Sequence, residues 1–238
     1  MVATTHPDLD LQSSIRPGLD ILANEIVIGL KKRTRFHQNL HLYQPGLVNG
    51  NPDVALLDYE LNRVESLHAE LGRYTFASQE SYTDVSGVSP VIKRQTPQSP
   101  IMRVSSGAST RILDFYKSWV GKSCPNGEKP ETYGETVTAD TNVLLSIIER
   151  VNLGKLVAES KFLELTPQFL QAEGNREKML ALIVRKDREE KVLALAENLA
   201  KHYDANVENI MDVFRFMITT TVDIEVEYLN VRIKNFNG

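Results

Sequence analysis

Apolar residues recur at every third or fourth position along most of this 238-residue chain. That spacing aligns side chains on one face of an α-helix, so it predicts amphipathic helices rather than strands. Apolar residues make up 42% of the sequence and charged residues 24%, which is enough apolar material for a buried core. We therefore expect an all-α helical bundle in a single domain that covers residues 1–238.

The apolar stripes predict helices in both halves of the chain. The first is expected to begin at Ser14, an N-cap residue, with Pro17 in its first turn. The second covers 53–74 and has the most regular stripe, formed by Leu57, Leu61, Val64, Leu67, Leu71 and Tyr74. Further helices are expected over 109–122, from Thr138 or Thr141 to Leu165, and over 167–173, 175–184, 187–203 and 207–233.

Residues 75–105 interrupt this pattern. They lack helical periodicity and are rich in Pro, Ser and Thr, which predicts a long irregular surface loop. The sequence contains no repeat of fixed period, and the loop is embedded between helices rather than placed between two domains.

Composition excludes several classes of protein. A formal net charge of −4 argues against a general nucleic-acid binder, which usually has a basic surface. The single cysteine, Cys124, rules out an intramolecular disulfide framework and suits a reducing compartment. The first ten residues lack the basic and apolar regions of a secretory signal, and no stretch of eighteen apolar residues occurs. We expect a cytoplasmic protein with no membrane or nucleic-acid partner.

The usual motifs of cofactor and covalent chemistry are absent from the sequence. It contains no phosphate-binding glycine-rich loop, no dinucleotide-binding glycine motif, no GxSxG and no HExxH. His37 and His41 share a helix face, but no third ligand accompanies them. The sequence therefore predicts neither a metal nor a cofactor.

Three pairs of polar residues share helix faces: Arg150 with Lys161, Arg185 with Glu189, and Thr221 with Glu225. Eleven residues span about three helical turns and four residues about one turn. Each pair alone is typical of a solvated helix face or a surface ion pair. Glu225, however, adjoins an apolar stripe, and a charge buried there needs a partner or a ligand. If the helices meet, these cations and carboxylates would form a receptor for a small dianion.

Residues 133–162, YGETVTADTNVLLSIIERVNLGKLVAESKF, resemble the long helix of the eukaryotic-type (AroQ-class) chorismate mutases. Residues 189–204 and 223–233 are similar to the later helices of those enzymes, and 14–36 to the first. The blocks keep the family's order across most of the chain, and VAESKF together with EVEYL is specific, whereas 75–105 diverges. The resemblance implies an all-helical homodimer that converts chorismate to prephenate without a cofactor.

The resemblance also implies a role for each polar residue. Arg16 and Arg150 would each hold a substrate carboxylate, and Thr221 would donate its hydroxyl to one of them. Lys161 and Glu225 would be the catalytic pair on either side of the ether oxygen whose bond breaks. At the other end of the substrate, Glu189 would accept a hydrogen bond from the ring hydroxyl.

Two positions depart from the family's pattern. Arg185 stands beside the ring hydroxyl, where the family commonly has Asn, so an added cation there would pair with Glu189, tighten binding of the dianion or accompany a changed ring substituent. The regulated fungal and plant enzymes carry Gly-Ser at an effector site between subunits, and this chain has Gly134 and Glu135. We include Arg73 in that candidate effector site, where the Glu135 carboxylate would change how an amino-acid effector is received.

Two other functions fit the same sequence. An enzyme of this fold that acts on isochorismate or on an amino-substituted chorismate would bind the same two carboxylates and differ near Arg185 and Glu189. A catalytically silent regulatory homologue would keep the fold, use the charges as surface pairs and fail to bind chorismate.

Overall fold

A computed structural model describes residues 9–93 and 98–236, and within them every regular element is a helix, with one isolated bridge between Pro45 and Ala55. The first eight residues, which carry most of the expectation about a secretory signal, lie outside the described part, as do 94–97 of the predicted loop. The helices are α1 (Arg16–Arg33), α2 (Leu56–Glu70), α3 (Ala108–Ser123), α4 (Tyr133–Asn152), α5 (Gly154–Glu164), α6 (Thr166–Gln171), α7 (Arg176–Ile183), α8 (Lys186–His202) and α9 (Val207–Lys234). The predicted all-α fold is confirmed.

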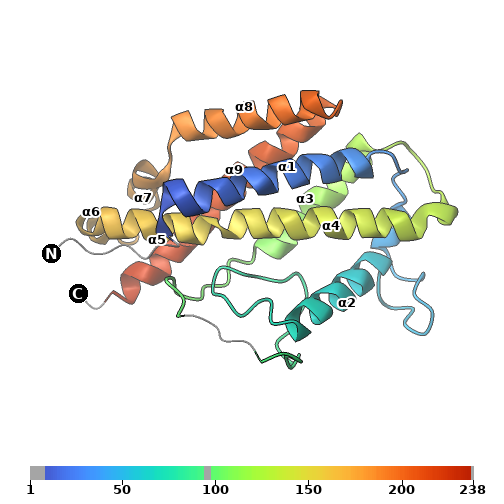
Figure 1. Cartoon of the computed structure of the whole chain (residues 1–238), viewed down its shortest axis with the longest axis horizontal. Helices are drawn as coiled ribbons and strands as arrows, with labels where there is room; N and C mark the ends of the chain where they lie inside the picture. The colour runs from blue at the N-terminus through green and yellow to red at the C-terminus, as the bar shows by residue number, and fades with distance from the viewer. Residues whose placement is uncertain (1–8, 94–97, 237–238) are drawn as a thin grey trace.

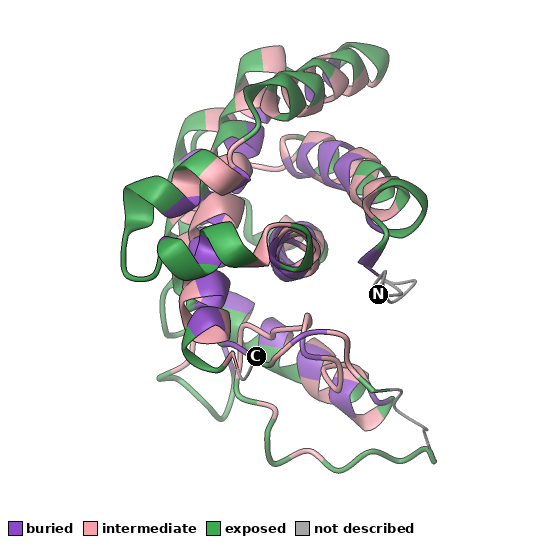
Figure 2. Ribbon diagram, turned by 90° about the vertical axis from the view of Figure 1, so that its left-hand side faces the viewer, coloured by how far each residue is buried: buried purple, intermediate pink, exposed green. Residues whose placement is uncertain are grey.

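Helices α4 and α5 form the long axis of the bundle, with α1 alongside and α9 crossing behind them (Figure 1). Helix α1 runs antiparallel to α4, since Arg33 near its end contacts Asp140 and Gly29 contacts Val143. A Cβ atom on Gly29 would lie 2.6 Å from Cγ2 of Val143, so the glycine permits this close approach. Figure 2 shows that the buried residues lie on the inward faces, while α8 is exposed on its outer side.

The described residues form two apolar clusters, and a fully paired charge network lies beside the larger one. The larger cluster joins α1, α3, α4 and α9, and the smaller joins α5, α6 and α7 with the C-terminal half of α9. Beside the larger cluster, Asp140 forms an ion pair with Arg33 and accepts hydrogen bonds at 2.8 Å from Tyr43 and at 2.8 Å from Tyr116. Burial of these charges is tolerated because every partner is present, and the network fixes α1 on α4.

Several predicted helix ends are wrong, because local capping outweighs the apolar pattern. The chain becomes helical at Leu11, where Asp10 and not Ser14 is the cap, accepting from the backbone N–H groups of Gln12 at 2.7 Å and Ser13 at 2.9 Å. Pro17 occupies the first turn of α1 as expected.

The long helix predicted from Thr138 or Thr141 to Leu165 is wrong at its start and in its continuity. It begins at Tyr133, after a short turn, so both threonines lie inside α4 and cap nothing. It also breaks at Leu153, where α4 ends and α5 begins.

The predicted loop is irregular, but it is more than a surface feature. Ala77, Ile101 and Val104 are buried in the smaller apolar cluster. By contrast, Leu67 and Leu71 of the stripe predicted over 53–74 are 53% and 50% exposed, and α2 ends at Glu70. No described helix combines the length and the apolar character that crossing a membrane requires.

Candidate active site

Lys161 of α5 and Glu225 of α9 face each other inside the bundle. The Lys161 ammonium lies 2.9 Å from Oε2 of Glu225 and donates a second hydrogen bond, 2.8 Å long, to the carbonyl of Ile183 at the end of α7. Their side chains are only 15% and 7% exposed. The ammonium is therefore largely shielded from solvent and lies where α5, α7 and α9 meet.

Gly154 allows α5 and α9 to approach this closely. The two helices run parallel, since their contacts advance together from Gly154 with Thr221 to Lys161 with Glu225 (Figure 1). A Cβ atom on Gly154 would lie 2.8 Å from Cγ2 of Thr221 and 3.6 Å from Cγ of Glu225. Any larger residue at this position would push α5 away from both side chains. The glycine that follows the helix break at Leu153 therefore positions the site.

Burial controls the protonation of Glu225. Desolvation raises its pKa above the usual value for a glutamate, although the nearby Lys161 ammonium lowers it. Glu189 of α8 adds a smaller upward contribution through its negative charge. Glu225 is therefore a carboxyl group held closer to its protonated form than an exposed glutamate, beside the start of α8.

Arg150 is a buried cation that has no carboxylate partner among the described residues. Its side chain is 6% exposed, its Nε has no hydrogen-bond partner, and its guanidinium lies 5.5 Å from the ring centre of Phe214. Burial lowers the pKa of Arg150 to about 10, with a small opposing effect from Asp20, so the group stays charged at neutral pH. A desolvated, uncompensated guanidinium is prepared for an anionic ligand.

Of the remaining predicted site residues, Arg16 and Arg185 lie at the starts of helices, whereas Thr221 lies in the middle of α9. Arg16 is the first residue of α1, following the turn Leu11–Ile15 that packs against α5. Arg185 precedes α8, is exposed, and forms no ion pair with Glu189 in the described structure. Thr221 uses its hydroxyl proton on the carbonyl of Met217 at 2.8 Å, so donation to a ligand requires the hydroxyl to rotate.

The three residues of the candidate effector site are not assembled within one chain. Arg73 follows α2 and pairs with Glu149 near the end of α4 at 2.5 Å. Gly134 and Glu135 lie in the first turn of α4, and Glu149 follows fourteen positions after Glu135, about 21 Å along the helix axis. A site that contains both parts requires a second chain.

Sequence reasoning missed several residues at this site. Gly154 was recognisable only as a glycine inside a helical pattern, which indicates a break or a close contact. Lys155, which is fully buried, and its partner Glu80 gave no signal, because Glu80 lies in the segment without periodicity. Within the described residues, no cluster of three His, Cys, Asp or Glu side chains suitable for a metal occurs.

Comparisons with known proteins agree with the all-helical fold. No protein-family profile matches the chain. It is 29% identical to a chorismate mutase of Emericella nidulans, over 95% of this chain and 93% of that protein, and 28% identical to one of Trichoderma parareesei, over 92% of each. Its fold matches a chorismate mutase of Candida albicans, solved in complex with L-Trp, with a TM-score of 0.89 at 23% identity, covering 98% of this chain and 96% of that one. The chain is therefore similar over nearly its whole length to fungal chorismate mutases, and it shares the all-helical fold of the Candida albicans enzyme.

Proposed function

We propose that this chain catalyses the Claisen rearrangement of chorismate to prephenate at the site between α4, α5, α8 and α9. The observation that carries this proposal is that the buried cation Arg150, near the end of α4, has no carboxylate partner among the described residues, while the next helix, α5, carries Lys161 of the buried Lys161–Glu225 pair. Such a site suits a substrate with two carboxylates and one reacting oxygen.

The reaction is unimolecular, so the site needs no nucleophile or external proton acceptor. The ether C–O bond breaks while a C–C bond forms between the enolpyruvyl arm and the ring, and no atom is gained or lost. Arg150 and Arg16 hold the two carboxylates and thereby keep the flexible arm folded over the ring. This restraint converts a rare conformer into the bound one, which lowers the entropic part of the barrier.

Lys161 and Glu225 act on the oxygen of the bond that breaks. Negative charge grows on this oxygen as the bond lengthens, and the Lys161 ammonium stabilises it in a site from which water is excluded. Glu225 contributes only when protonated, because an ionised carboxylate has no hydrogen to donate. The raised pKa of Glu225 favours that form.

An assay of chorismate loss with identification of the product tests this proposal. Prephenate formation by the purified chain is the expected result. Because Arg185 is an exposed cation beside Glu189, the same assay is run with isochorismate and an amino-substituted chorismate. Turnover of one of these but not of chorismate would assign the related-substrate function. If none of the three compounds is converted or bound, the chain is a catalytically silent homologue.

Glu225→Gln is expected to flatten the alkaline limb of the pH–rate profile. In the wild type, kcat falls as pH rises through the Glu225 ionisation, since the donating form is lost; an amide donates at every pH. The control is Glu227→Gln, because burial also raises the pKa of Glu227, which lies two residues along α9 and pairs with Arg111. That variant should keep the limb. An unchanged profile in Glu225→Gln would contradict the assigned role.

We further propose that the protein is a cytoplasmic homodimer whose effector site lies between subunits. The buried single thiol of Cys124 suits a reducing compartment. Exposed Leu67, Leu71 and Val91 support an interface near the end of α2, where Val91 is hydrogen-bonded to the Glu70 carbonyl at 2.8 Å. Sedimentation equilibrium measures the mass of the assembly, and titration with L-Trp tests the effector site.

A further inference from the structure

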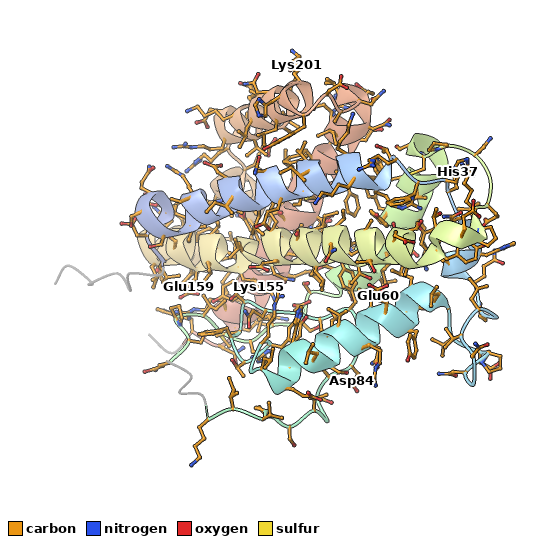
Figure 3. The ribbon with its side chains drawn as sticks, turned by 45° about the vertical axis from the view of Figure 1, so that its right-hand side comes forward. His37, Glu60, Asp84, Lys155, Glu159 and Lys201 are labelled. Carbon is orange, nitrogen blue, oxygen red and sulfur yellow. The ribbon has the colours of Figure 1, made fainter. Side chains whose placement is uncertain are left out.

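Lys155, the second residue of α5, is a cation with no exposed surface. Its ammonium forms an ion pair with Glu80, which lies in the irregular segment between α2 and α3. The Glu80 carboxylate also accepts hydrogen bonds from the backbone N–H and the hydroxyl of Ser106, each 3.0 Å long. Two distant parts of that segment, at Glu80 and at Ser106, are therefore joined next to Lys155. Figure 3 shows Lys155 on the side of α5 that faces the irregular segment.

This ion pair lies directly beside the break between α4 and α5. Gly154, which precedes Lys155, packs against Thr221 and Glu225, whereas α4 ends at Asn152. Arg150 lies before the break and Lys161 after it. A helix that is broken at this point has no continuous hydrogen-bond ladder to fix the angle between its two parts, so the spacing of the two cations depends on what holds α5.

We propose that Lys155 is a positioning residue for the rearrangement: anchored by Glu80, it fixes α5 relative to α4 and so places Lys161 at the ether oxygen. This inference rests on the proposed function. Lys155 does not touch the substrate and acts through the orientation of α5.

The position of the break predicts which kinetic constant changes. The residues that hold the carboxylates, Arg16 and Arg150, lie on α1 and α4, before the break, so binding of the ground state survives loss of the anchor. Lys161 lies on α5, and a small displacement of it removes stabilisation that exists mainly in the transition state. We expect Lys155→Met to lower kcat at least about tenfold while KM changes less than about threefold.

A matched control separates positioning from general loosening of the segment. Glu65 of α2 is also fully buried and holds the same segment, accepting from the N–H groups of Tyr82 at 2.7 Å and Thr83 at 2.8 Å. Glu65→Gln should lower thermal stability as Lys155→Met does, because both break a buried polar anchor, but it should leave kcat unchanged. Equal losses of kcat in the two variants would overturn the proposal.

The test measures kcat, KM and melting temperature for the wild type, Lys155→Met, Glu65→Gln and the double variant Lys155→Met/Glu80→Leu. The double variant leaves no unpaired buried charge, so it folds if Lys155→Met alone does not, and it should show the same loss of kcat. Wild-type kcat in a folded Lys155→Met or in the double variant would overturn the proposal. Wild-type turnover in the same assay reports separately on the proposed function, which fails only if the wild type itself forms no prephenate.

Discussion

The variant Lys161→Ala should lose at least about 100-fold in kcat, because one donor to a developing oxyanion contributes about 3 kcal/mol in comparable sites. The variant should still fold. The ammonium is buried, 2.9 Å from Glu225, and no other cation contacts that carboxylate among the described residues. Folding survives because Glu225, whose pKa burial already raises, takes up a proton when its partner is removed instead of remaining an unpaired buried anion.

Lys201→Ala is the control for this change. Lys201 lies near the end of α8, is 62% exposed and pairs with Glu197 one turn earlier (Figure 3). Its removal should leave both kcat and KM unchanged, since exposed pairs of this kind contribute little. Steady-state kinetics and circular dichroism measure the two variants side by side. Near-normal turnover in a folded Lys161→Ala would refute the catalytic assignment.

Arg150→Met should lower kcat/KM at least about 100-fold and, at the same time, raise the melting temperature of the ligand-free protein. The loss follows from removal of two charge-assisted hydrogen bonds to a substrate carboxylate. The gain follows from removal of a buried guanidinium that has an unpaired Nε and a pKa lowered to about 10 by desolvation. Methionine fills the volume of the aliphatic stem, so the melting temperature should rise by about 3–6 °C.

Thermal melts with and without a bicyclic mimic of the transition state separate these two effects. The mimic should stabilise the wild type and leave Arg150→Met unchanged. Arg215→Met is the matched control, because Arg215 is exposed on α9 and pairs with Glu208 at 2.9 Å and Asp212 at 3.2 Å. It should change neither property. An Arg150→Met variant that is less stable than the wild type and keeps its kcat/KM would contradict both parts of the expectation.

Periodicity predicted the helical class and most helices correctly, because apolar spacing reports directly which face of a helix is buried. It failed at the break at Leu153, since Val151, Leu156 and Val157 continue the apolar pattern across it. Only Gly154 marked the interruption.

The apolar stripe over 53–74 indicates a face but not what covers it. Leu67 and Leu71 extend that face beyond the core and remain exposed in the described structure. The spacing of apolar residues is the same whether a residue packs into the core of its own chain or remains exposed on the surface.

The candidate site was predictable only in part for a related reason. Spacing places Arg150 with Lys161 and Thr221 with Glu225, but the meeting of α5 with α9 is a tertiary contact that no local pattern contains. The resemblance to a family supplied that connection. The Lys155–Glu80 ion pair was not predictable, because Glu80 lies in a segment without periodicity. The two residues come together only in the folded chain.

The proposed function requires that five side chains from separate helices bind one small dianion. Calorimetric titration with the bicyclic transition-state mimic tests this requirement most directly. One mimic should bind per chain in the wild type, at least about 100-fold more tightly than the KM for chorismate. Single substitutions of Arg16, Arg150, Lys161, Glu189 and Glu225 should each weaken it. Absence of binding to the wild type, or wild-type affinity in these variants, would contradict the central claim.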